Sequence, residues 1–240
     1  MTKLTANTST GTLKILALVF MFCDHAGKML LPLVPEMRII GRIAFPLYCW
    51  CLVVGAHHTR SFARYALRIA LVGLISQPLY MAALNHTWRE PNIFLTLLLG
   101  LCALWGMRER KLWSHIWAPA AALVLAVVLK ADYGWKGVLL IIALWTVRDS
   151  RAGIAAVMTL MCLYWGTTSS AVTEFFGLSL RPLTAYPIGT VLGPLLRTQA
   201  LAILALPLML IRMPNLRLPA WAGYAMYPAH LVLLWVLERV

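Results

Sequence analysis

Long apolar runs separated by short polar turns make up most of the chain. The runs lack the alternation of apolar and polar residues that is typical of a half-buried strand, and they are longer than strands. They therefore predict helices, which satisfy their backbone hydrogen bonds within one segment as a bilayer requires. At about 20 apolar residues for each span, the pattern predicts about 8–10 transmembrane helices, drawn from the ranges 12–34, 38–56, 65–84, 92–107, 113–130, 134–147, 152–168, 183–196, 198–212 and 218–237.

The composition supports a membrane protein. Of 240 residues, 61% are hydrophobic and 12% are charged, and the mean hydropathy is +0.79. A soluble domain of this size would expose a very large apolar patch. We therefore expect an all-α polytopic integral membrane helix bundle, a single transmembrane domain over residues 1–240. The polar tail, residues 1–11, is expected to be cytoplasmic, and the apolar run after it lacks a small-residue cleavage site, which favours a retained helix.

The charged residues and the cysteines indicate how the chain is oriented in the membrane and argue against nucleic acid and metal as ligands. The formal net charge is +13, but the basic residues are scattered through short loops, which does not favour nucleic-acid binding. Cytoplasmic loops are rich in Lys and Arg, and this bias favours the cytoplasm for both termini and for Arg60, Arg64, Arg68, Arg108, Arg110, Lys111, Arg148 and Arg151. All five cysteines lie in apolar runs without a histidine at metal-ligand spacing. We expect no metal.

The stretch "FMFCDHAGKML" places ionisable residues inside the first apolar run. Asp24 and Lys28 are four residues apart and share a helix face, so they can pair. A short turn leads to the next run, which brings Lys28 near the level of Arg42, and cations there would keep Asp24 ionised. Ionisable groups this deep in a membrane usually mark a site. The alternative is an ion-paired structural lock, with His25 a hydrogen-bonded core residue.

The last apolar run repeats this pattern in "YAMYPAHLVLL". Tyr224, Tyr227 and His230 follow at intervals of three and share a helix face. His230 falls near mid-membrane, where it is either part of a site or a satisfied core histidine. "ADYGWKGVLLI" groups Asp132, Tyr133 and Lys136 at the start of another run, as an acceptor contact or an ordinary interfacial turn. The remaining histidines are expected to be ordinary loop-edge residues: His57, His58, His86 and His115.

Five segments in this order resemble the TraX family of conjugative-transfer membrane proteins, typified by the F-type pilin N-acetylase. They are "KILALVFMFCDH", "GRIAFPLY", "NIFLTLLLG", "YGWKGVLLI" and "YAMYPAHL". The resemblance implies a membrane acyltransferase-like protein of the bacterial inner membrane that transfers an acetyl group from acetyl-CoA to the N-terminal amine of a pilin subunit. The matching site residues are Asp24, His25, Gly41, Arg42, Tyr133, Gly134 and His230.

A reaction hypothesis follows from the resemblance and the residue types together. Asp24, His25 and His230 are the catalytic candidates, with one histidine as the base and Asp24 supporting the imidazole. Substrate or oxyanion contacts are assigned to Lys28, Arg42, Tyr133 and Tyr227. The CoA phosphates are assigned to loop bases, namely Arg60, Arg64, Arg108 and Arg110. The expected partners are a pilin subunit, acetyl-CoA and membrane lipids.

Three other functions remain open on the sequence. A transpeptidase that trims or cyclises pilin would need a nucleophile, for which Cys23 and Cys49 are the candidates. A pilin scaffold would need only an apolar helical surface. A transporter would also use intramembrane charges, but the chain has no internal repeat to support it.

Overall fold

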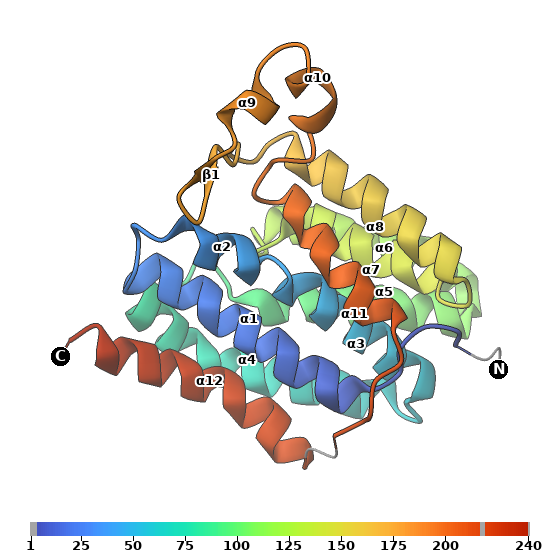
Figure 1. Ribbon diagram of the computed structural model, residues 1–240. Helices are drawn as coiled ribbons and strands as arrows, with labels where there is room; N and C mark the ends of the chain where they lie inside the picture. The colour runs from blue at the N-terminus through green and yellow to red at the C-terminus, as the bar shows by residue number, and fades with distance from the viewer. Residues whose placement is uncertain (1–3, 217–218, 240) are drawn as a thin grey trace.

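The computed structural model describes residues 4–216 and 219–239 and shows a bundle of helices (Figure 1). Residues 1–3 of the expected tail and residue 218 of the last expected span lie outside the described residues. The long helices are α1 (Thr10–Met29), α3 (Ala44–His58), α4 (Phe62–Leu84), α5 (Ile93–Glu109), α6 (Ser114–Val128), α7 (Gly134–Thr146), α8 (Arg151–Gly166) and α12 (Ala220–Leu237). The shorter elements are α2 (Pro35–Gly41), η1 (Lys111–Trp113), β1 (Glu174–Phe175), β2 (Leu178–Ser179), α9 (Arg181–Thr184), α10 (Gly189–Leu192), η2 (Ala200–Leu204) and α11 (Ala205–Leu210).

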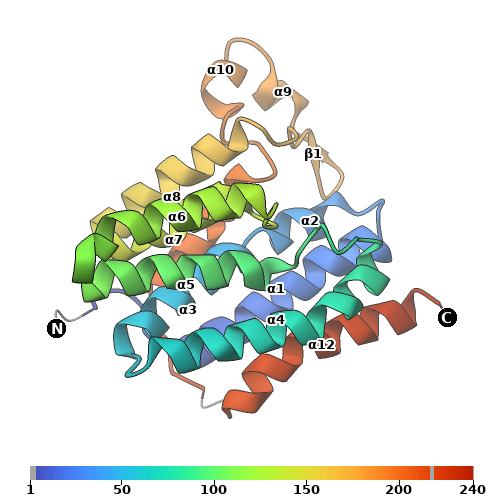
Figure 2. The same cartoon turned by 180° about the vertical axis from the view of Figure 1, so that it is seen from behind.

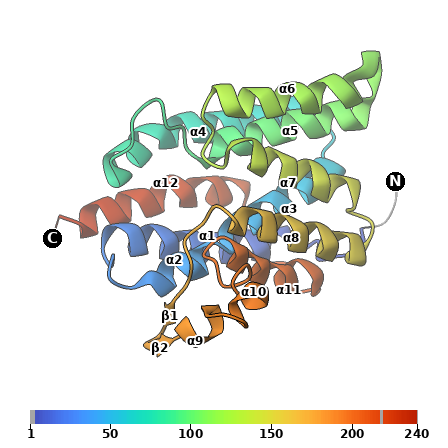
Figure 3. The same cartoon turned by 90° about the horizontal axis from the view of Figure 1, so that it is seen from above.

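Helix α3 forms the centre of the bundle. It packs against α1, α5, α7 and α11, and its residues Phe45, Leu47 and Trp50 are fully buried. Figure 3 shows α4, α5 and α6 along one side and α8 and α11 towards the other, with α1 and α3 between them. Figure 2 shows α12 lying along α4. A helix that is apolar on all faces, as α3 is, belongs in such a buried position.

The bundle has the surface of a membrane protein. Three helical stretches are long and apolar enough to cross a membrane: Pro35–His58, Phe62–Leu84 and Lys111–Val128. Large apolar side chains face outwards from α4 and α6, including Leu74, which is 68% exposed, and Val128, which is 67% exposed. Such surfaces are stable against lipid tails. The predicted all-α polytopic membrane bundle is therefore confirmed.

One predicted span is wrong. Residues 183–196 form no membrane-length helix but lie in an irregular, largely exposed segment, with α9 and α10 of four residues each. Prolines at positions 187 and 194 explain the failure, because each lacks a backbone N–H and interrupts helical hydrogen bonding. The hairpin of β1 and β2 belongs to the same segment, which projects from the bundle above α2 and α8 (Figure 1).

The two ends of the chain lie at opposite ends of the bundle (Figure 1). Helices α1 and α12 run in parallel, since Lys14 shares a cavity wall with Tyr224 while His25 contacts His230 further along both helices. The cytoplasmic position expected for both termini stays a prediction, because the structure contains no membrane.

The described part of the N-terminal tail packs into the bundle. Leu4, Ala6 and Asn7 are buried. The Asn7 carbonyl accepts a hydrogen bond from Trp50 Nε1 at 2.7 Å, and Asn7 Nδ2 donates to the Leu208 carbonyl at 2.9 Å. Residues 4–9 therefore tie α1 to α3 and α11, which the polar composition of the tail did not reveal.

Candidate functional site

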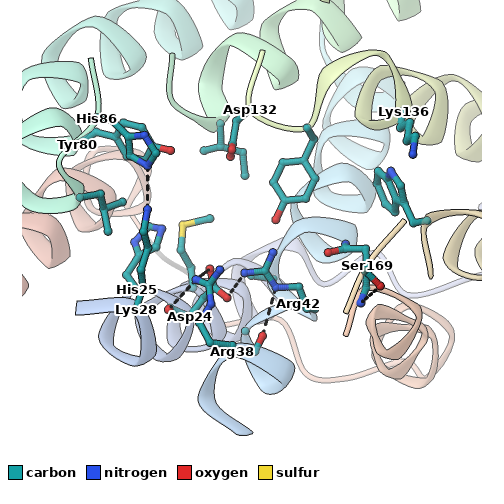
Figure 4. Close-up of a pocket in the computed structure, with 18 of the residues that line it drawn as sticks. Asp24, His25, Lys28, Arg38, Arg42, Tyr80, His86, Asp132, Lys136 and Ser169 are labelled. Carbon is teal, nitrogen blue, oxygen red and sulfur yellow. Dashed lines mark hydrogen bonds and ion pairs between the residues drawn. The ribbon is translucent and has the colours of Figure 1, made fainter. Parts of the chain in front are cut away.

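A polar cavity of about 450 Å³ opens at one end of the bundle. The C-terminal ends of α1, α4 and α8 meet the N-terminal ends of α3, α5 and α7 there, and α2 closes one side. We call this cavity the chamber (Figure 4). Its lining residues are Met21, Asp24, His25, Lys28, Arg38, Gly41, Arg42, Ala44, Tyr80, Leu84, His86, Ile93, Asp132, Tyr133, Lys136, Trp165, Thr168, Ser169, Gln199 and Tyr227.

The two histidines singled out in the sequence contact each other. His25 Nδ1 and His230 Nε2 lie 3.0 Å apart, and their rings are stacked. His25 lines the chamber, whereas His230 is buried behind it and packs edge-on against Tyr227. In the neutral pair one ring donates and the other accepts, so a His25 that donates through Nδ1 keeps a free lone pair at Nε2.

Asp24 is bound by two arginines. Its Oδ2 accepts from Arg38 Nη1 at 2.9 Å, and its Oδ1 accepts from Arg42 Nη2. Arg42 Nε also donates to the Arg38 carbonyl at 3.2 Å, which fixes the guanidinium. Gly41 makes this contact possible, since a Cβ added there would collide with Asp24. In the "GR" pair, Gly41 thus allows α2 to approach α1 closely, and Arg42 is one of the two cations that bind Asp24.

The four-residue spacing had suggested that Lys28 pairs with Asp24, but the structure shows a different partner. Its Nζ lies 3.0 Å from His86 Nε2, and His86 Nδ1 lies 3.5 Å from a carboxylate oxygen of Glu90. The His86 ring stacks on Tyr80 with 4.7 Å between centroids. The sequence predicted an ordinary loop-edge residue at His86, and the structure shows that this residue lines the chamber. The contact joins residues 58 positions apart, which local spacing cannot reveal.

The turn that carries His86 is held rigid from within the bundle. Asn92 caps α5 by accepting from the Phe94 amide at 3.0 Å, and its Nδ2 donates to the Gly73 carbonyl at 2.9 Å. Gln77 bonds both the Asn92 amide and the Glu90 carbonyl. The "NIFLTLLLG" segment thus begins with the residue that anchors this turn, and Glu90 is held at a fixed place by bonds to Thr87, which lower the pKa of its exposed carboxyl.

Aromatic rings form the floor of the chamber. Tyr133 stacks on Phe45 with 3.6 Å between centroids and lies 6.0 Å from Trp165. Gly137 permits this packing, because a Cβ there would meet Tyr133, Thr96 and Phe45. Tyr227 packs edge-on against Phe94 and is also buried. Both predicted tyrosines therefore reach the chamber.

Two further cavities lie along α1 towards the other end of the bundle. A cavity of about 80 Å³, here called the neck, shares Tyr227 with the chamber. A cavity of about 340 Å³, here called the basic cavity, shares Lys14, Tyr65 and Tyr224 with the neck. The basic cavity is also lined by Gly55, His58, Thr59, Arg60, Ser61, Arg64 and Arg68.

The four predicted phosphate-binding arginines lie away from the chamber. Arg60 and Arg64 line the basic cavity. Arg108 donates to the carbonyls of Ala56 and Thr59, both at 3.0 Å, and so holds the end of α3. Arg110 is exposed in a turn with a left-handed backbone. The structure thus separates the four arginines into two cavity residues and two that line none of the three cavities.

Cysteine or metal chemistry gains no geometric support. Cys23 and Cys49 do not line the chamber. Within residues 4–216 and 219–239, no group of three or more His, Cys, Asp and Glu side chains is placed to hold a metal ion.

The sequence did not single out several chamber residues. Arg38 had a signal, since it lies four residues before Arg42 on the same helix face. No sequence signal marked the other four residues, because the helix ends that carry them meet only in the folded bundle. They are Tyr80, Thr168, Ser169 and Gln199.

Comparison with known proteins places this geometry in a family. A family model described as "TraX protein" matches residues 9–238. The "Probable fimbrial assembly protein FimC, serogroup H1" of Dichelobacter nodosus is 32% identical over 110 residues, covering 40% of this chain and 45% of that protein. An uncharacterized protein of Rickettsia prowazekii (strain Madrid E) is 35% identical over 97 residues, covering 40% of this chain and 37% of that protein. Each match thus spans less than half of the relative, and no solved structure matches.

Proposed function

Because the chain belongs to the TraX family, we propose that it modifies pilin in the bacterial inner membrane by transferring an acetyl group from acetyl-CoA to the pilin N-terminal amine. The relative from Dichelobacter nodosus, named as a probable fimbrial assembly protein, supports a role in pilus assembly. The observation that carries the chemistry is the His25–His230 pair at the wall of a polar chamber. We place the chamber on the face opposite the cytoplasm, because the loops with Arg60, Arg108 and Arg148 lie at the other end and basic loops favour the cytoplasmic side.

His25 is the general base of the proposed reaction. It faces the chamber, and a hydrogen bond from its Nδ1 to His230 Nε2 leaves Nε2 free to take a proton. His230 is a positioning residue, because it is buried behind His25 and fixes the ring and its tautomer. The sequence suggested that Asp24 supports the imidazole of the catalytic histidine, but in this proposal it has a different role. It binds both Arg38 and Arg42 and so fixes the wall beside His25.

Lys28 is placed to stabilise negative charge as the carbonyl is attacked. An ammonium group has three N–H donors, and His86 accepts one of them. The remaining donors can face the oxyanion of a tetrahedral intermediate and stabilise the negative charge that develops there. Arg42 is the alternative donor, although Asp24 already binds one end of its guanidinium.

The three cavities give acetyl-CoA a route to the histidines. The basic cavity offers Arg60, Arg64 and Arg68 to the phosphates. The narrow neck accepts a slender chain such as the pantetheine arm. Lys14 and His25 are eleven residues apart on α1, which at 1.5 Å per residue is about 16 Å. The thioester would then enter the chamber past Tyr227.

The reaction balances with the groups named. The pilin ammonium loses one proton to His25, and the neutral amine attacks the thioester carbonyl. Collapse of the intermediate breaks the C–S bond and releases the CoA thiolate, which takes up a proton. The second amine proton leaves as the amide forms. The net products are N-acetyl-pilin, CoA and one proton.

Isotope transfer tests the proposal. Membranes containing the protein are supplied with pilin and with acetyl-CoA that carries a deuterated acetyl group. The proposal predicts that the labelled acetyl group appears at the pilin N-terminus, and that His230→Gln slows its appearance by less than His25→Ala does. Pilin that gains no label, or that loses a water in the absence of CoA, would contradict the proposal, the latter in favour of cyclisation.

A further inference from the structure

Asp132 differs from every other charged residue of the chamber. It lies in the turn between α6 and α7, and Figure 4 shows it across the chamber from Asp24 and Arg42. Asp24, Arg38 and Arg42 bind one another. Lys28 contacts His86, and Lys136 donates to Thr168 at 3.3 Å. In the part of the chain that the structure describes, Asp132 makes no hydrogen bond or ion pair of its own.

The chamber has more basic than acidic side chains, which makes the Asp132 carboxylate important for binding a cation. Four basic side chains, Lys28, Arg38, Arg42 and Lys136, face two acidic ones, Asp24 and Asp132. A cationic ligand would be repelled by most of this wall, and the carboxylate of Asp24 is already occupied. Asp132 is therefore the place at which an ammonium group finds an unshared acceptor.

We propose that Asp132 binds the protonated amine of the acceptor and presents it to His25. This assignment rests on the proposed amine acceptor and adds the residue that recognises it. The Asp132 carboxylate favours the charged form of the bound amine, while the four cations of the wall favour its neutral form and so assist transfer of its proton to His25. Asp132 thereby makes the chamber selective for a free N-terminal amine over a blocked one.

The pH dependence of binding follows from the same surroundings. Asp132 is an exposed residue by its surface area, yet the protein around the chamber partly desolvates its carboxyl and raises the pKa to about 6, with Asp24 adding to the rise and Arg42 and Lys28 opposing it. An α-amine titrates near about 8, so the ammonium and the carboxylate coexist mainly between these values. The other titratable groups that face this part of the chamber are His25, Arg38, Tyr80, His86, Tyr133, Lys136 and Tyr227.

Binding of two small probes tests the proposal on the detergent-purified full chain. The probes are tetra-alanine amide with a free N-terminus and the same peptide N-acetylated. Wild-type protein is expected to prefer the free amine by about tenfold or more, the effect of one charge-assisted hydrogen bond. Asp132→Asn should reduce the preference to less than twofold, while Asp132→Glu retains a preference. Affinity of the wild type should rise between pH 5 and 7 and stay level in Asp132→Asn.

The matched control is Glu90→Gln, which removes a carboxylate at the same end of the bundle but outside the chamber lining. It should leave the preference unchanged, and unfolding midpoints establish that each variant is folded. An Asp132→Asn protein that still prefers the free amine would overturn the assignment. Acetyl transfer with an unchanged acceptor KM in Asp132→Asn would overturn it while leaving the proposed function standing. Amine preference that depends on Asp132 without any acetyl transfer would support the site and refute the proposed function.

Discussion

The Asp24 contact with Arg38 and Arg42 is expected to stabilise the fold, and Asp24→Asn removes it with little change in shape. The amide nitrogen of the new side chain would face a guanidinium donor. The Arg42 side chain is 15% exposed, so its charge-assisted bond is worth about 1.5–3 kcal/mol. The Arg38 side chain is 37% exposed, so its bond adds at most about 1 kcal/mol. The loss is therefore about 2–4 kcal/mol, in the range known for breaking buried pairs.

Thermal unfolding of the purified protein measures this loss. For a chain of this size, about 2–4 kcal/mol corresponds to a fall in Tm of about 5–15 °C. Removing both partners should cost less than the sum of the single changes, since Asp24→Asn/Arg42→Gln leaves no unpaired Arg42 cation. The reasoning is refuted by a fall below about 2 °C in Asp24→Asn, or by single changes that simply add.

Three further predictions concern packing, the rival chemistry and the donor route. Gly41→Ala should destabilise the protein by about 1–3 kcal/mol, because its Cβ would overlap Asp24, whereas Gly223→Ala, where nothing lies within 4 Å, should not; unfolding midpoints compare them. Cys23→Ala should leave acetyl transfer unchanged, as followed by pilin mass, and a lost activity would favour a cysteine nucleophile. Arg64→Glu should raise the KM for acetyl-CoA at least tenfold while Arg110→Glu does not, and equal effects would exclude the basic cavity as the phosphate site.

The bundle was largely predictable because its signals are local. Apolar runs of span length give α1, α4 and α5 within a few residues of their observed bounds. The prediction failed at residues 183–196, where the apolar composition suggested a helix although two prolines, Pro187 and Pro194, interrupt helical hydrogen bonding.

The site was predictable in its residue types more than in its contacts. Asp24, His25, Lys28 and Arg42 stand out because ionisable groups are costly in a membrane, and all four line the chamber. Their partners were not predictable from spacing, which reports only on neighbours along one helix. His25 contacts a residue 205 positions away, so the pairing of the two histidines depends on the parallel course of α1 and α12.

The central claim is that His25 deprotonates a pilin amine for acetyl transfer. Its most direct test is the intact mass of the pilin from cells that express the wild-type protein or His25→Ala at matched levels. The account predicts pilin heavier by one acetyl group with the wild type and unmodified pilin with the variant. Pilin of the same mass in both cells, or pilin lighter by one water with the wild type, would contradict it.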